Sequence, residues 1–306
     1  MPETHDSNRH QAHPAAPLCS AFDPQPRTPQ LRLPAGSCDC HAHICGPAEH
    51  YPYAEERIYT PPDALAEDYL RMLQIVGVQR AVIVQPSVYA DDNRVLLKAL
   101  AGLTIPCRGV AVIDAALPDR QLENLHRAGV RGVRFNLVDV RDPSGRIDLG
   151  AVRGLAERVA RLGWHAEFLA HVDDYPDLDR MFADFPVAVV FGHMGYLRSP
   201  PAVGNAGFQA LLRLLRGGNC WVKLTGPMRI SAGDLPYPDV TAIARALVAA
   251  APDRLIWGSD WPHVKISGKM PNDGDLVDLL ADWIPDAEIR RRILIDNPVR
   301  LYDFPS

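Results

Sequence analysis

The 306-residue sequence lacks the segments that mark a membrane or secreted protein. No apolar run approaches the roughly 18 residues that a membrane-spanning helix needs. The N-terminus has no apolar core of the kind that a signal peptide carries. We therefore expect a cytoplasmic protein with no membrane partner.

Basic runs and paired cysteine motifs are also missing. The net charge is −5 and no Lys/Arg-rich run occurs, so the sequence shows no electrostatic footprint for nucleic acid. Its six cysteines form no C-x-x-C pair and no regular framework. Cys38 and Cys40 are two apart in a predicted strand, where they are poorly placed to bond, so we expect free thiols in a reducing compartment.

Residues 1–36 show neither a period of 2 nor a period of 3.6 and are rich in Pro, His and polar types. We expect a mostly disordered or extended segment there, with Pro24–Pro34 extended across the rest of the molecule and no role for the histidines of the first 20 residues. Nothing marks an internal boundary after it. Because α/β barrels run to about 250 residues or more as one domain, residues 37–306 are predicted to form a single domain.

From Ser37 onward, short β-rich runs alternate with amphipathic segments. The predicted strands are Cys38–His43, Arg80–Gln85, Cys107–Val112, Gly132–Phe135, His165–Ala170, Val187–Phe191, Trp221–Leu224 and Leu255–Gly258. The predicted helices are Ala64–Val76, Asn93–Leu103, Asp119–Ala128, Ala151–Leu162, Asp177–Phe185, Gly207–Arg216, Val240–Ala250, Asp275–Ile284 and Asp286–Leu294. Eight continuous apolar strands with helices between them predict an α/β fold of the (β/α)8 TIM-barrel type. A doubly wound sheet is the rival, but no Gly-rich fingerprint follows the first strand.

The stretch Asp39-Cys40-His41-Ala42-His43 places two histidines at the end of the first predicted strand. Residues two apart in a strand face the same side, so their imidazoles lie together. Such a pair begins a metal site or polarises a carbonyl group; two surface histidines in a loop are the plain alternative.

A barrel carries its catalytic residues at the carboxyl ends of its strands, and this chain has polar residues at most of them. They are His41 and His43, Gln85 and Ser87, Arg134 and Asn136, His171, His193, Lys223, Thr225 and Arg229, and Asp260 and His263. So many polar groups at one face favour a functional site.

The residue types suggest different tasks. Asp260 lies between aromatic residues, where desolvation raises the basicity of a carboxylate, so we interpret it as the base that activates water; a helix N-cap is the alternative. Gly192 and Gly195 flank His193 and indicate a close approach of backbone to ligand rather than a buried core histidine.

Arginines and hydroxyl groups complete the candidate site. Arg134 and Arg229 are candidates for bidentate binding of a substrate carboxylate, with surface ion pairs as the alternative. Tyr59 and Ser87 are weaker candidates, because loop hydroxyls often bind backbone. His171 and His263 are included as substrate-binding candidates, and Lys223 is interpreted as structural.

Several motifs resemble the amidohydrolase superfamily, and within it the 2-pyrone-4,6-dicarboxylate hydrolases of lignin-aromatic breakdown. They are Leu33-Pro34-Ala35-Gly36, His43-Ile44-Cys45-Gly46-Pro47, Tyr59-Thr60-Pro61, Asp92-Asn93-Arg94, residues 129–136, Gly163-Trp164-His165, residues 257–263 and residues 296–302. The likeness runs from about Leu31 to Tyr302 and is specific as a set.

The resemblance implies roles for the histidines, the aspartate and the arginines. In that family, imidazoles polarise a lactone carbonyl without a metal, and the aspartate after the eighth strand activates water. This assigns His41, His43 and His193 to the carbonyl and Asp260 to the water. By the same resemblance Arg134, Arg229, Ser87 and Tyr59 contact substrate carboxylates.

Two positions depart from the family pattern. A family Lys-Arg pair is Asp139-Val140 here, followed by Arg141, and a family tyrosine is matched by Leu169. Both positions bear on substrate carboxylates. Because of these departures, the pyrone dicarboxylate itself is in question as the substrate. Compounds with a muconolactone-type ring remain alternative substrates.

We therefore expect a hydrolase that opens an anionic lactone in aromatic catabolism and needs no cofactor. The alternative enzyme is a zinc-dependent amidohydrolase or non-oxidative decarboxylase of the same superfamily, with one zinc at His41, His43, His171 and Asp260. An alternative of another class is a non-catalytic protein that binds small anions. It would need the arginines but not a base.

Overall fold

The computed structural model describes residues 16–139, 147–266 and 268–305. Eight parallel strands follow each other around one sheet in the order β1 to β8. They are β1 (Cys38–Ala42), β2 (Arg80–Val84), β3 (Cys107–Ala111), β4 (Val130–Asn136), β5 (His165–Leu169), β6 (Val189–Phe191), β7 (Cys220–Leu224) and β8 (Leu255–Trp257). All eight predicted strands are confirmed, each to within two residues at either end.

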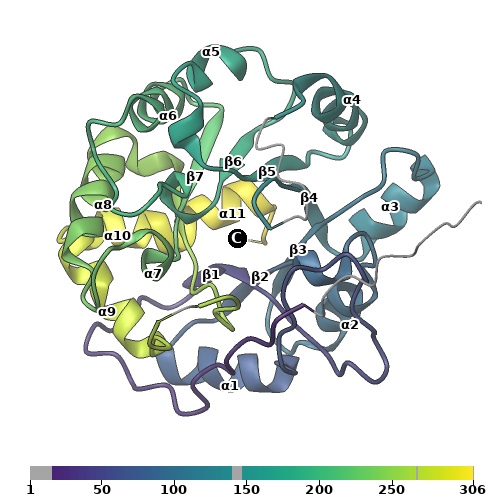
Figure 1. The fold of residues 1–306 in the computed structure, drawn as a ribbon, viewed down its shortest axis with the longest axis horizontal. Coiled ribbons are helices and arrows are strands. Elements are labelled where there is room, and N and C mark those ends of the chain that lie inside the picture. The colour runs from purple at the N-terminus through teal and green to yellow at the C-terminus, as the bar shows by residue number, and fades with distance from the viewer. Residues whose placement is uncertain (1–15, 140–146, 267, 306) are drawn as a thin grey trace, which may run out of the picture.

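Helices surround the strands, so the predicted (β/α)8 barrel is confirmed (Figure 1). The helices are α1 (Ala66–Val76), α2 (Arg94–Gly102), α3 (Asp119–Arg127), α4 (Leu149–Ala160), α5 (Leu178–Met181), α6 (Ala206–Arg216), α7 (Pro227–Ile230), α8 (Pro238–Ala250), α9 (Asp273–Trp283), α10 (Ala287–Arg291) and α11 (Asn297–Tyr302). The helix expected over Asp177–Phe185 is wrong in length, since only α5 forms and the chain then runs irregularly to Pro186, a residue that a helix cannot continue through. Within the described residues, no helix is both long and apolar enough to cross a membrane.

The barrel closes next to the predicted site. The backbone N–H of Asp260 donates to the carbonyl of His41 at 2.8 Å, and that of His43 donates to the carbonyl of Trp261 at 2.8 Å. The segment after β8 is therefore joined to β1 through residues of the site itself. Backbone hydrogen bonds thus hold the histidines at the end of β1 next to the aspartate after β8, although these residues lie far apart in the sequence.

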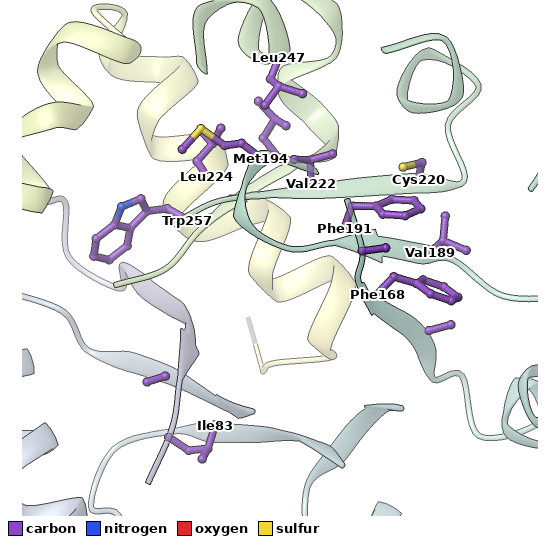
Figure 2. Packing of buried hydrophobic residues seen from close by; sticks show 14 of the residues in the cluster. Ile83, Phe168, Val189, Phe191, Met194, Cys220, Val222, Leu224, Leu247 and Trp257 are labelled. Atoms are coloured by element: carbon purple, nitrogen blue, oxygen red, sulfur yellow. The ribbon is translucent and has the colours of Figure 1, made fainter. Parts of the chain in front are cut away.

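Apolar side chains fill the layer between strands and helices. Phe168 of β5 and Phe191 of β6 stack with ring centroids 5.6 Å apart. Figure 2 shows them beside Val222 of β7, with Leu247 of α8 reaching into the same layer. A second apolar cluster joins the strands to the last helix and includes Cys38, Cys40, Trp221, Leu301 and Tyr302.

The segment before β1 packs against the barrel from residue 16 onward. The guanidinium group of Arg27 lies 2.5 Å from carboxylate oxygens of both Asp275 and Asp278 on α9. The ring of Phe22 lies 4.8 Å from that of Trp261, the residue after Asp260. The histidines of the N-terminal tail and Arg141 fall outside the described residues.

Candidate active site

A β-bulge in β1 turns both histidines of the H-x-H motif into the barrel. The register against β2 shifts between Asp39 and Ala42, and bulges commonly re-aim side chains beside active sites. The rings of His41 and His43 lie 4.9 Å apart, centroid to centroid, and both are buried. The Nδ1 of His43 donates a hydrogen bond to the carbonyl oxygen of Val84, 2.7 Å away.

His193 and Asp260 complete the cluster from two loops with left-handed backbone. Their φ angles are 47° and 70°, conformations that non-glycine residues rarely adopt outside functional sites. The Oδ1 of Asp260 lies 3.8 Å from His41 Nε2 and 3.9 Å from His193 Nε2. Oδ1 has no hydrogen-bond partner in the described part of the chain. The structure thus brings together all four residues predicted to be catalytic.

Two glycines make this close packing possible. A Cβ on Gly226 would lie 2.6 Å from His193 Nδ1, and a Cβ on Gly258 would lie 2.7 Å from the Cβ of His41. Any side chain at either position would push an imidazole away from Asp260.

The charge on Asp260 is stabilised by Arg229, which lies on α7. The Nε of Arg229 donates to Asp260 Oδ2 at 2.6 Å, and its Nη2 donates to the Val264 carbonyl at 2.9 Å. Burial alone would raise the pKa of Asp260, but the charge of Arg229 outweighs it and holds that pKa well below its usual range. The expectation that desolvation makes Asp260 more basic is wrong, because a cation touches the carboxylate.

The three histidines are neutral. Burial, helped by the charge of Lys223, lowers the pKa of His41 to about 4. Burial also lowers the pKa of His43 and of His193 well below the usual value. At neutral pH each ring therefore carries one proton and one lone pair.

A charged layer lies directly beneath the cluster; sequence reasoning named its lysine, Lys223, as structural and missed its carboxylate, Glu167. Lys223 of β7 and Glu167 of β5 are buried with Nζ and Oε2 2.7 Å apart. Burial alone would raise the pKa of Glu167, but Lys223, His165 and His41 hold it well below its usual range. The available signal was one charged residue of each sign in two otherwise apolar strands, Trp221-Val222-Lys223-Leu224 and His165-Ala166-Glu167-Phe168-Leu169.

Asp39 is a second residue that sequence reasoning missed. Its carboxylate accepts hydrogen bonds from the backbone of His41 and of Ser259, from the Ser259 hydroxyl at 2.5 Å and from the Tyr69 hydroxyl at 2.9 Å. It therefore ties the histidine strand to the loop that carries Asp260. Burial raises the pKa of Asp39 to about 6.

Three predicted substrate-binding residues come from different segments: Arg134 lies on β4, Ser87 follows β2, and Tyr59 lies between β1 and α1. Arg134 is buried and its Nη1 donates to the Gln85 carbonyl at 2.5 Å. The hydroxyl groups of Ser87 and Tyr59 are 3.2 Å apart. The charge of Arg134 adds to the effect of burial in lowering the pKa of both His43 and His193.

A cavity of about 310 Å³ opens beside Arg229 and is also lined by Tyr196, Lys265 and Lys269. The Nζ of Lys265 lies 2.7 Å from Asp139 Oδ1, so the loops after β4 and β8 are joined by an ion pair near this cavity. No histidine lines the cavity.

Two predicted residues lie elsewhere. His171 stacks on Tyr196 with ring centroids 4.8 Å apart, and its Nδ1 lies 2.6 Å from the Tyr196 carbonyl oxygen, so it holds a loop instead of joining the cluster. His263 is fully buried, with Nε2 3.1 Å from Asp273 Oδ1. The backbone turns back on itself between Asp260 and His263, where the His263 N–H donates to the Asp260 carbonyl at 2.8 Å.

The donors fit a zinc ion poorly. Among the described residues, only His41, His43 and Asp260 form a group whose ligand atoms lie within 4.8 Å of one another, so the predicted fourth ligand His171 is missing from it. Histidine ligands donate their second ring N–H to an acceptor, as His43 does to the Val84 carbonyl. The Nδ1 of His41 instead lies 3.1 Å from the Nζ of Lys223, and a cation on that side opposes a metal on the other.

Fold and site together define a barrel enzyme with a histidine–aspartate centre at the carboxyl ends of its strands. The chain belongs to the amidohydrolase family, whose model matches residues 38–304. It is 38% identical to the 2-pyrone-4,6-dicarboxylate hydrolase of Comamonas testosteroni over 287 residues, 90% of this chain and 93% of that protein.

Two further relatives agree with this membership. The chain is 38% identical to the 4-sulfomuconolactone hydrolase of Hydrogenophaga intermedia over 303 residues, covering 95% of this chain and 97% of that one. Among solved structures, a protein of Agrobacterium tumefaciens in its apo form superposes with a TM-score of 0.81 at 30% identity, covering 90% of this chain and 99% of that one.

Proposed function

We propose that this enzyme opens the ring of an anionic lactone by hydrolysis, as a step in the breakdown of aromatic compounds. The observation that carries the proposal is the state of Asp260. One of its oxygens is held by Arg229, and the other is buried, lacks a hydrogen-bond partner among the described residues, and faces two imidazoles. A carboxylate oxygen in this state can act as a general base that takes a proton from a water molecule.

The reaction uses one water and one ring ester. Asp260 Oδ1 takes a proton from water as the oxygen adds to the lactone carbonyl carbon, and an imidazole N–H stabilises the negative charge that forms on the carbonyl oxygen. The intermediate then collapses with cleavage of the ring C–O bond. The proton held by Asp260 passes to the leaving oxygen, so the products are a carboxylic acid and a hydroxyl group on one open chain.

The charged groups around the cluster suit an anionic substrate. The relatives named above act on a dicarboxylate and on a sulfonated lactone. In this chain Arg229 pairs with Asp260 and lines the cavity, and Arg134 is a second guanidinium group, buried on β4. Guanidinium groups bind carboxylate and sulfonate oxygens in pairs.

We further propose that the preferred lactone carries a smaller or differently placed anionic load than the pyrone dicarboxylate. Asp139 stands where the related family has a cation, and among the residues that the structure describes its ion-pair partner is Lys265, at 2.7 Å. A second substrate carboxylate near Asp139 would compete for that lysine. A like-charge contact of this kind costs about 1 kcal/mol or more when partly desolvated.

A panel of lactones tests the proposed function. Purified enzyme is given 2-pyrone-4,6-dicarboxylate, sulfonated and carboxylated muconolactones, and a neutral lactone, and ring opening is followed by ultraviolet absorbance and by mass spectrometry. We expect the highest kcat/KM with an anionic lactone that carries one charged group. Absence of ring opening throughout the panel, together with tight binding of the same anions, would instead support a binding protein.

The zinc-dependent alternative rests on the one group of three donors, His41, His43 and Asp260. We propose that the enzyme works without metal, in the reducing cytoplasm that its free cysteines suit. Metal analysis of protein purified without added metal, followed by assay in a strong chelator, separates the two. Stoichiometric zinc and loss of turnover in chelator would favour the alternative.

A further inference from the structure

The buried pair Lys223 and Glu167 has no task in the proposed reaction. Such a pair is costly to bury, and its loss of hydration is offset only by good local partners. Lys223 has three: Glu167 Oε2 at 2.7 Å, the carbonyl oxygen of Cys40 at 2.8 Å, and Nδ1 of His41 at 3.1 Å. The third contact reaches the catalytic cluster, so the pair is connected to the chemistry.

The contact with Lys223 determines which nitrogen of His41 holds the proton. An ammonium group has only donors and a neutral imidazole has one donor and one acceptor. If Nδ1 carried the proton, two donors would face each other at 3.1 Å. Glu167 Oε1 also approaches Nδ1, but at 3.4 Å it is farther away than the ammonium group, which pairs with the other oxygen, Oε2. Nδ1 is therefore the acceptor, and the proton is on Nε2.

His43 is in the opposite state. Its Nδ1 lies 2.7 Å from the carbonyl oxygen of Val84, which can only accept. The proton of His43 is therefore on Nδ1, and its Nε2 offers a lone pair. The two rings are 4.9 Å apart and face the same space, yet one presents a donor there and the other an acceptor.

We propose that Lys223 is a positioning residue that fixes the proton of His41 on Nε2, making His41 the hydrogen-bond donor to the lactone carbonyl and leaving His43 as an acceptor. The proposal rests on the proposed function for its chemical meaning. It divides the histidine pair into two roles. His41 Nε2, which has no hydrogen-bond partner among the described residues, stabilises the oxyanion. His43 Nε2 accepts a hydrogen bond from the attacking water or from a substrate hydroxyl.

Nitrogen-15 spectra of the histidine rings test the proton positions directly. In protein labelled at histidine, long-range correlation spectra distinguish protonated from bare ring nitrogens, and His41→Asn and His43→Asn variants identify the signals. At neutral pH we expect a bare Nδ1 for His41 and a bare Nε2 for His43. A protonated Nδ1 on His41 would overturn the proposal. Because this measurement needs no substrate, its failure is distinct from failure of the proposed function.

The double variant Lys223→Met/Glu167→Met removes the cause. Both charges are removed together, since a lone buried Glu167 would become protonated and donate to His41 in place of the lysine. We expect His41 to lose its single tautomer and kcat to fall on the order of tenfold or more, with KM changed by less than about threefold. An unchanged tautomer and kcat would refute the role of Lys223.

His165→Gln is the matched control. His165 lies on the far side of Glu167, 3.9 Å from Oε2, and has no contact with Nδ1 of His41. The His165→Gln substitution alters the same buried layer but removes no contact of His41 Nδ1. We therefore expect the tautomer of His41 to be retained and kcat to stay within about threefold of wild type. If this control changes the tautomer as the double variant does, Lys223 has no special role. If the double variant fails to fold, the wild-type spectrum still decides the proton positions.

Discussion

Replacing Asp260 by Asn removes the proposed base and leaves the shape of the site in place. The amide oxygen can still accept the hydrogen bond from Arg229 Nε that Oδ2 accepts at 2.6 Å. The amide nitrogen then takes the place of Oδ1, between the two imidazoles at 3.8 and 3.9 Å. The backbone bond to His41 is untouched, so we expect Asp260→Asn to fold normally.

The magnitude follows from what could replace the carboxylate. Within the described residues no second carboxylate joins His41, His43 and Asp260 in the cluster. The neutral imidazoles are the remaining bases, and buried, weakly basic rings substitute poorly. We expect kcat to fall on the order of a thousandfold, equivalent to about 4 kcal/mol of transition-state stabilisation. KM should change little, because the arginines that bind the anion remain.

The assay is steady-state hydrolysis of the best lactone of the panel, with circular dichroism to verify the fold. Asp273→Asn is the matched control, because Asp273 is equally buried and its carboxylate lies beyond His263, outside the substrate space. It loses the same charge and should keep kcat within about tenfold. Hydrolysis by Asp260→Asn within about tenfold of wild type would remove Asp260 from the mechanism. So would an equal loss in both variants.

Four further changes test the surrounding groups. Arg134→Met should raise KM strongly for anionic lactones and much less for a neutral one, and an equal rise for both would mean that Arg134 only holds structure. Asp139→Asn should free Lys265 and raise kcat/KM for the pyrone dicarboxylate about fivefold relative to a mono-anionic lactone; no change in this ratio would contradict the proposed preference. Burial raises the pKa of Asp39 from 3.8 to about 6, so its contribution to stability is present below pH 4 and is lost as the pH rises through 6. We expect the free energy of unfolding, measured by urea denaturation, to fall between pH 4 and 8 by about 2 to 3 kcal/mol less in Asp39→Asn than in wild type. Equal falls in the two proteins would refute the assignment. Prolonged treatment with a strong chelator should leave kcat unchanged, and loss of activity that added zinc restores would contradict metal-free hydrolysis.

Arg229 also affects the basicity of Asp260, in addition to its proposed role in binding the substrate. Its contact with Asp260 lowers the pKa of that carboxyl, so Asp260 is ionised at any neutral pH but is a weak base in the free enzyme. A substrate anion that binds the same guanidinium group would weaken the effect of Arg229 on Asp260. The pKa of Asp260 would then rise, and Asp260 would be a stronger base when the substrate is bound. Arg229→Met should therefore affect neutral lactones as well, unlike Arg134→Met.

The order of the strands and the face that carries the site follow from the sequence alone. Continuous apolar runs at regular spacing predict parallel strands, and parallel strands in a barrel point their carboxyl ends to one face. His41 and His43 lie at the end of the first run, His193 follows the sixth and Asp260 follows the eighth, so their meeting could be predicted from chain order without any distance. Each such prediction depends only on local periodicity and on topology.

The state of those residues was decided by the tertiary structure. Whether Asp260 is a strong or a weak base depends on Arg229 lying 2.6 Å away, and the short helix that carries this arginine has no sequence period to detect. The proton positions of the two histidines depend on Lys223 and on the Val84 carbonyl, which lie far from them in sequence. Electrostatic energies change steeply with distance and with burial, and neither quantity is encoded locally. The sequence could therefore name the reacting groups, whereas only the folded chain determined their charge and their protons.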